Sequence, residues 1–212
     1  MNFNLIKSFL AEYSEFIMQP IVGSEMIIKG NLRRTLHHES FGSIDIDYSL
    51  LIHIPFDYPE NLPIIFESKG AIQNSPSNHI NPDGSFCLGS PLRLKILSKR
   101  NSDFKYFFEE CVLPYLYAVT INIQQGGGFA FGELEHGTTG LILDLQDFFC
   151  LKDSSQVYQM LKILSSRKKL ANRMICPCGC KQRVTRCNYF KYILRMRKML
   201  TRAEWEEQLQ LI

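Results

Sequence analysis

Three hydrophobic segments between residues 25 and 68 constrain the fold of this chain more than any other feature. The second segment, SIDIDYSLLIHIP, has apolar side chains at Ile44, Ile46 and Tyr48 in alternation, which is typical of a strand with one buried face. EMIIKGNLRR precedes it, PIIFES follows it after two prolines, and both are typical of strands. Consecutive strands without intervening helices indicate an antiparallel sheet.

Helical patterns on both sides of this block predict an α+β fold with about four strands. A first helix is expected over residues 3–17. Residues 69–100 show no sustained period, and the next helix is expected to begin at Ser102 or Asp103, with Pro114 kinking it. TGLILDLQDFF and SSQVYQMLKILSS predict two further helices, and NYFKYILRMRKML and AEWEEQLQLI predict the last two. SSRKKLANR is interpreted as a linker.

The cysteines of the chain indicate metal binding rather than cross-links. There are seven, an odd number, and four of them crowd into CPCGCKQRVTRC as Cys176, Cys178, Cys180 and Cys187. Zinc prefers four tetrahedral ligands, so four thiolates would satisfy a structural ion and leave no open position for catalysis. Reduced surface thiols are the alternative. The spacing of Cys176, Cys178 and Cys187 resembles the small SEC-C zinc motif, with Cys180 replacing that motif's last ligand.

Charge divides the chain unevenly. Residues 154–212 carry 13 Lys and Arg against 3 acidic residues, whereas residues 1–153 carry 11 against 18. Together with the expected linker SSRKKLANR, this asymmetry predicts a body over residues 1–165 and a small basic zinc lobe over residues 166–212. The basic segment could be a solvated face, could bind nucleic acid or could bind an acidic protein surface. Helical spacing of Tyr189 and Tyr192 favours packing over base stacking, so a protein partner is expected and nucleic acid is not.

No apolar run reaches the roughly 18 residues that a membrane span needs, and the first residues do not have the pattern of a signal peptide. We expect a cytoplasmic protein that does not bind membranes.

The segment NHINPDGSFCLG places one cysteine, Cys87, directly after a turn. Pro82 restricts its own φ, Asp83 supports a turn, and Gly84 tolerates a positive φ. A lone cysteine is most often a small buried hydrophobe. Here it lies between two breaks in a long irregular segment, which indicates a thiol at the rim of the fold.

YPENLPIIFES followed by HINPDGSFCLG resembles the ubiquitin-conjugating enzymes. That family has strands ending in a Tyr-Pro and Pro-rich stretch, and then a Gly-x-x-Cys-Leu active site, here Gly84 to Leu88. The resemblance extends over roughly residues 1–165 and implies a fold with an N-terminal helix, an antiparallel sheet and C-terminal helices. The family's asparagine eight residues before the cysteine is His79 here, and Gly89 stands where the family has an aspartate. These departures make the chain similar to the bacterial members of the family.

The resemblance implies that Cys87 accepts an acyl group as a thioester and passes it to an amine. His79 would stabilise the oxyanion or deprotonate the amine, and otherwise is a solvated turn residue. His136, in FGELEHGTTG, would be a second acid or base, and otherwise caps the following helix.

Similar bacterial enzymes accompany cGAS-like nucleotidyltransferases in antiphage defence, where the C-terminus of the cyclase is the conjugated group. The implied partner is such a protein, activated by a separate enzyme or by the cyclase itself. A cysteine peptidase using Cys87 and His136, and an inactive scaffold, are the alternatives.

Overall fold

The computed structural model describes residues 3–21, 23–126, 129 and 137–212. The chain forms two compact units, Met1–Glu133 and Leu134–Ile212, which are described here separately. Among the described residues, no helix is both long enough and apolar enough to cross a bilayer.

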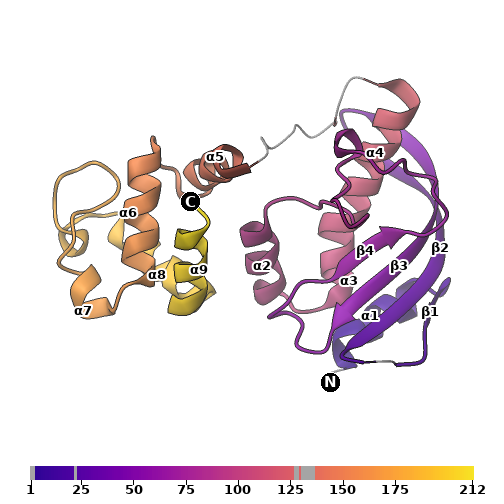
Figure 1. Cartoon of the computed structure of the whole chain (residues 1–212), viewed down its shortest axis with the longest axis horizontal. Coiled ribbons are helices and arrows are strands. Elements are labelled where there is room, and N and C mark those ends of the chain that lie inside the picture. Colours follow the sequence, from indigo (N-terminus) through magenta and orange to yellow (C-terminus); the bar gives the residue numbers. More distant parts are fainter. Residues whose placement is uncertain (1–2, 22, 127–128, 130–136) are drawn as a thin grey trace. The chain divides into compact units, whose positions relative to one another are not determined.

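The first unit is built on an antiparallel sheet of four strands in the order β1-β2-β3-β4, which confirms the α+β class (Figure 1). The strands are β1 (Phe16–Met18), β2 (Glu25–His38), β3 (Gly42–Pro55) and β4 (Ile64–Glu67). Buried residues alternate with exposed ones along β2 and along the first half of β3, as expected for a sheet with one buried face.

Helices cover the buried face of the sheet. The first unit contains α1 (Asn4–Glu12), α2 (Pro91–Arg100), α3 (Phe104–Phe107) and α4 (Leu113–Gln125), with a π-helical segment over Phe108–Val112. Phe9 lies at the centre of this core, with ring centroids 4.9 Å from those of Phe104 and Phe108. Pro114 lies in the first turn of α4, where its missing N–H is tolerated. The π-helical segment directly precedes α4.

Two local expectations need correction. The first helix ends at Glu12 rather than residue 17, because Phe16 to Met18 pair with β2 as strand β1. A Cβ at Gly30 would lie 2.7 Å from the Phe16 ring, so this glycine permits the close approach of the two strands. Helix α2 occupies Pro91–Arg100, inside the stretch expected to be irregular, and begins with a proline in its first turn.

The second unit is helical. It contains α5 (Gly137–Phe149), α6 (Ser154–Ser165), α7 (Lys168–Ala171), α8 (Phe190–Met199) and α9 (Arg202–Gln210). The short α7 lies in the segment interpreted as a linker, which is therefore partly helical. Thr201 and Glu204 form the expected capping box at the start of α9. Phe149, Ile193 and Trp205 are fully buried in this unit.

The boundary expected at residue 165 lies inside the second compact unit, which begins at Leu134. Helix α6 contacts α5 and α9, so it belongs to the same unit as the cysteine cluster. The functional division into a conjugating domain and a zinc lobe stays a prediction.

Candidate functional site

Cys87 lies at the end of a small hairpin that follows β4. We call residues 79–88 the Cys87 hairpin. Its tip is a four-residue turn in which Gly84 N–H donates to the Asn81 carbonyl at 2.9 Å, and Gly84 has a φ of +86°. The Asp83 carboxylate accepts from the Ser85 hydroxyl and amide, which lower the pKa of Asp83. Ile80 and Phe86 pair across the hairpin as a single antiparallel bridge.

A backbone hydrogen bond joins the hairpin to the sheet, and ring packing joins it to α4. Phe86 N–H donates to the Ile65 carbonyl of β4 at 2.8 Å, and the Phe86 ring lies 4.5 Å from the Tyr115 ring. The Tyr115 hydroxyl donates to the carbonyl of buried Asn78 at 2.8 Å. Asn122, one helical turn from the end of α4, donates its side-chain amide to Asn78 Oδ1 at 3.1 Å. The backbone on both sides of His79 is therefore held in place.

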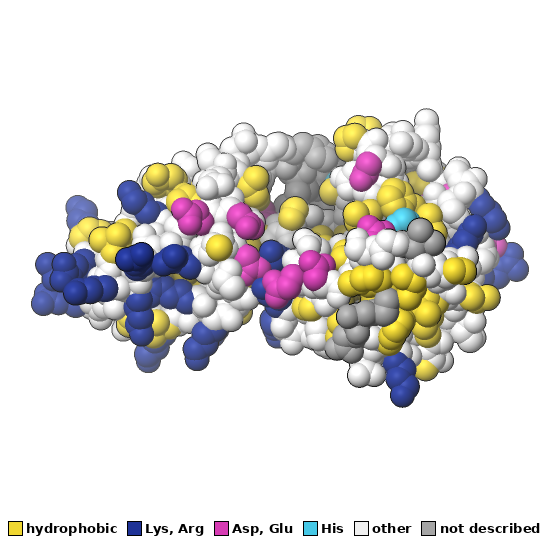
Figure 2. Space-filling view, turned by 60° about the horizontal axis from the view of Figure 1, so that its bottom comes forward, with side chains coloured by type: hydrophobic (Ala, Val, Ile, Leu, Met, Phe, Trp, Pro, Cys, Tyr) yellow, Lys and Arg dark blue, Asp and Glu magenta, His cyan; other side chains and the backbone are white. Residues whose placement is uncertain are grey.

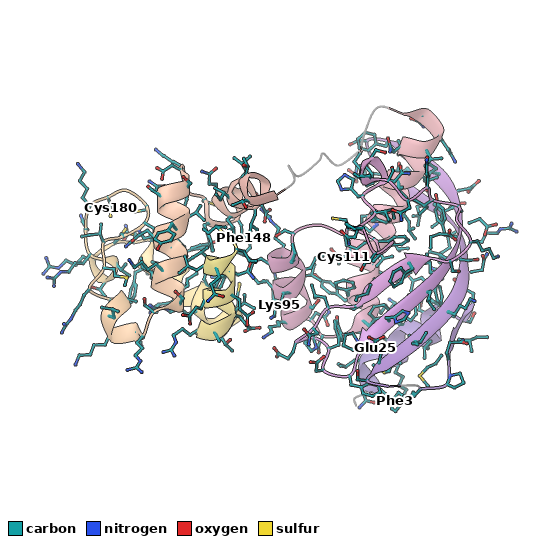
Figure 3. All side chains as sticks on the ribbon, in the orientation of Figure 1. Phe3, Glu25, Lys95, Cys111, Phe148 and Cys180 are labelled. Carbon is teal, nitrogen blue, oxygen red and sulfur yellow. The ribbon has the colours of Figure 1, made fainter. Side chains whose placement is uncertain are left out.

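The Cys87 thiol is half-buried, unlike the other cysteine of the first unit. Cys111 is 8% exposed, and burial, with a contribution from Glu110, raises its pKa to about 12, so this thiol is a core group (Figure 3). Cys87 N–H donates to the His79 carbonyl at 2.8 Å. Burial raises the pKa of Tyr115, and the charges of Tyr48 and Cys87 raise it further. The turn therefore presents a thiol beside a buried tyrosine and leaves it partly open to solvent.

His79 is next to Cys87 through the backbone and has an unusual conformation. Its φ of 50° and ψ of 49° are left-handed, which is uncommon for a residue other than glycine. Its ring packs edge-on against the ring of Phe129, with centroids 4.1 Å apart. His79 and Cys87 are the residues outside the Ile80–Phe86 bridge, and both are half-buried. The structure thus brings these two predicted site residues together.

His136 lies outside the described residues. The Asn81 side chain donates to the Ser85 hydroxyl at 3.0 Å and to the Phe86 carbonyl at 3.3 Å, so it supports the hairpin from within. Tyr115 and Asn122 were not identified from the sequence, because they lie more than 25 positions from Cys87 and only the fold brings them close.

The four clustered cysteines converge at one point in the second unit. The Sγ atoms of Cys176, Cys178, Cys180 and Cys187 all lie within 4.8 Å of one another. The Cys176–Cys178 and Cys178–Cys187 separations are 3.3 and 3.5 Å. Four thiolates around a tetrahedral zinc with Zn–S near 2.3 Å are about 3.8 Å apart. The donor set and its spacing fit a structural metal site.

A short hairpin positions three of these thiols. Ile175 pairs with Arg183, and Cys176 N–H donates to the Gln182 carbonyl at 2.8 Å. Gly179 takes a φ of +83° at the reversal between Cys178 and Cys180. Tyr189 N–H donates to Cys187 Sγ at 3.4 Å, the kind of amide contact that stabilises a coordinating thiolate. Burial raises the pKa of Cys176, so a cation is needed to hold that thiol ionised.

The surrounding helices support the cluster. Gln159 of α6 donates to the Ile175 carbonyl at 3.2 Å. The hydroxyls of Tyr189 and Tyr192 donate to the carbonyls of Phe149 and Phe148. These bonds satisfy the last carbonyls of α5, which would otherwise be unpaired at a helix end. Both tyrosines therefore pack within the unit, as their spacing predicted.

Comparison of the chain with family models, curated proteins and solved structures finds no significant match.

Proposed function

We propose that this chain is an acyl carrier of the ubiquitin-conjugating type, with Cys87 as the carrier thiol. The observation that supports it is the half-buried Cys87 on a hairpin held by β4, Tyr115 and Asn78. Cys87 held in this way can accept and release an acyl group without rearrangement of the backbone around it. The order of elements, with a helix, a four-strand sheet, the cysteine segment and then helices, is the order that the resemblance implies.

The proposed reaction has two steps. The Cys87 thiolate attacks the carbonyl carbon of an activated C-terminus, usually a thioester on an activating enzyme, and expels that enzyme's thiolate. An amine then attacks the Cys87 thioester, which forms an amide and returns the Cys87 thiol. His79 acts in the second step by donating to the oxyanion or by accepting the proton of the amine. A cGAS-like nucleotidyltransferase remains the partner that we propose as the donor of the C-terminus.

The four-cysteine cluster holds one structural zinc in this proposal. Zinc with four thiolates carries a net charge of −2, and Lys181, Arg183 and Arg186 in the same segment offset it. The ion would organise a lobe whose own apolar core is small.

A peptidyl thioester made with a small thiol tests the first step without an activating enzyme or an identified partner. We expect intact-mass analysis to show one peptidyl adduct, removed by reductant thiols, and peptide mapping to place it on Cys87. The variant Cys87→Ala should lose the adduct. Cys150→Ala is the matched control, because Cys150 is an exposed cysteine of the second unit and should not carry the peptide. An equal yield of adduct in Cys87→Ala would refute the assignment.

Addition of an amine to the loaded protein tests the second step. The proposal expects an amide product at a rate above that of hydrolysis. Release of free peptide acid at an unchanged rate would instead favour the peptidase, which depends on Cys87 and His136. Failure to accept any acyl group would favour a scaffold.

A further inference from the structure

The second unit contains an open cavity of about 340 Å³ that is separate from the cysteine cluster. It lies where α6, α7, α8 and the start of α9 meet. This volume is at the lower end of the range for small-molecule pockets, about 300–1,000 Å³. Two leucines line it, and its polar lining consists of Ser166, Arg167, Lys168, Arg197, Arg202 and Trp205. Among the residues that the structure describes, no acidic residue is part of that lining.

Four cationic side chains surround the cavity: Arg167, Lys168 and Arg202 are exposed and screened by solvent, whereas Arg197 is half-buried. Together they make the cavity electropositive. Within the described parts of the chain, Arg167, Lys168 and Arg202 form no ion pair. Glu204, which is close in sequence, accepts through Oε2 from the Thr201 amide and hydroxyl at the cap of α9. Figure 2 shows many Lys and Arg side chains gathered at one end of this unit, with Asp and Glu side chains in smaller number.

Two buried donor atoms at the cavity have no hydrogen-bond partner in the described part of the chain. Trp205 is fully buried, and its indole Nε1 has no hydrogen-bond partner among the described residues. Arg197 donates through Nη2 to the Ile163 carbonyl at 3.1 Å, while its buried Nη1 has no partner in the described structure. Burial lowers the pKa of Arg197, which reflects the cost of an uncompensated buried charge. Buried donors are normally satisfied, so an unpaired indole and an unpaired guanidinium nitrogen at one cavity indicate a missing acceptor.

We infer that this cavity binds the phosphate group of a small phosphorylated molecule. Phosphate oxygens accept from guanidinium and indole N–H groups, and planar guanidinium groups suit them in particular. The two leucines and the indole leave an apolar wall for the rest of the ligand. This site is independent of the proposed acyl transfer, since its residues all lie in the second unit and include no cysteine.

Trp205 is the single tryptophan of the chain, so its fluorescence reports directly on this cavity. Titration of the full chain with glucose 6-phosphate should give a saturable change in Trp205 emission. Inorganic phosphate should compete for the same site, whereas glucose should have no effect. An identical response to sodium chloride at matched ionic strength would show charge screening alone and would overturn the proposal. Tighter binding of a dicarboxylate such as succinate would overturn the assignment to phosphate.

Calorimetric titration with glucose 6-phosphate tests the residues. Arg197→Gln should weaken binding roughly tenfold or more, the effect of losing a charge-assisted hydrogen bond. Trp205→Phe keeps an aromatic ring, removes the N–H and should also weaken binding. Lys191→Gln removes the same charge from an exposed position of α8 outside the cavity and should bind like the parent chain. Equal weakening by Lys191→Gln would contradict a defined site.

The folding of each variant is checked by circular dichroism and metal content. If Arg197→Gln does not fold, Arg202→Gln is the second variant, because Arg202 is exposed at the first position of α9 and lines the cavity. It should weaken binding of glucose 6-phosphate in the same way. A double variant removes Arg167 as well as Arg202. If it folds and binds glucose 6-phosphate as tightly as the parent chain, the inference is overturned.

Discussion

His79 is the residue of the site whose backbone is least ordinary. A left-handed conformation costs a side-chain-bearing residue roughly 1–2 kcal/mol, and asparagine tolerates it better than most. Here the cost is offset by three contacts: the amide of Cys87 on the His79 carbonyl, the Phe129 ring and the Pro76 carbonyl. The backbone conformation sets the direction in which the imidazole points away from the hairpin. Replacement of His79 therefore tests the backbone geometry and the chemistry of the side chain together.

We predict that His79→Ala slows transfer of the acyl group from Cys87 to an amine by about 100-fold, the effect of losing one oxyanion donor. Formation of the thioester should change much less. His79→Asn should retain most of the activity, because asparagine accepts the left-handed backbone and supplies an amide donor. Single-turnover discharge of loaded protein measures the rate. Parent-like discharge by the alanine variant would remove His79 from the mechanism.

The Cys87 hairpin is an element whose position depends on α4. Its own strands share a single bridge, and an isolated hairpin of this size is marginal in water. Contacts with Tyr115, Asn122 and Ile65 therefore determine whether the thiol is held or mobile.

Tyr115→Phe should destabilise the first unit by about 1–3 kcal/mol, because the buried Asn78 carbonyl loses its donor. The hairpin should also become more open to proteolysis. Urea unfolding gives the free energy, and limited proteolysis locates the change. Tyr106→Phe, a half-buried tyrosine of α3, is the matched control and should stay close to the parent. An unchanged free energy of unfolding in Tyr115→Phe would mean that this bond does not hold the hairpin.

The cysteine cluster is the corresponding element of the second unit. We predict about one equivalent of zinc per chain in protein purified without chelator. Removal of the metal, or Cys176→Ser, should lower the melting temperature of this unit and reduce its helical signal. The reason is that the ion that links the four thiolates is lost or held less tightly. Cys150→Ser should keep the metal, since Cys150 is not part of the cluster. Metal-free protein with the same melting curve would contradict a structural zinc.

At the scale of the whole molecule, the charge distribution is the dominant feature. Residues 154–212 have a net charge of +10, while residues 1–153 have a net charge of −7. We propose that the exposed cations of α8 bind an acidic protein surface and raise the local concentration of the donor tail. Arg197 does not belong to that surface, because it is half-buried and bonded to the Ile163 carbonyl.

Combining Arg195→Gln with Lys198→Gln should weaken binding of the protein partner, because two exposed charges are removed. The remaining binding should depend less on salt concentration than that of the parent chain. Loading of Cys87 from a small peptidyl thioester should stay unchanged. The control combines Lys29→Gln with Lys69→Gln, which removes two exposed charges from the first unit. Affinity is measured by calorimetry at two salt concentrations. Length-dependent binding of RNA or DNA, lost in the α8 variant, would contradict a protein partner.

Features that depend on neighbouring residues could be predicted from the sequence. The alternation in β3, the Asp103 cap, the Thr201–Glu204 capping box and the turn before Cys87 all involve residues a few positions apart. The convergence of the four cysteines was predictable for the same reason, since they lie within twelve residues.

The sequence by itself thus determined the fold class, the exposed turn and the donor set, because local backbone preferences and short spacings encode them. Only the tertiary structure decided that Phe16 to Met18 form a strand, since pairing with β2 outweighs a local helical pattern. The same holds for Tyr115, which reaches Asn78 across 37 positions. The cavity around Trp205 likewise exists only where helices α6 to α9 meet, because no local pattern specifies which distant side chains share a space.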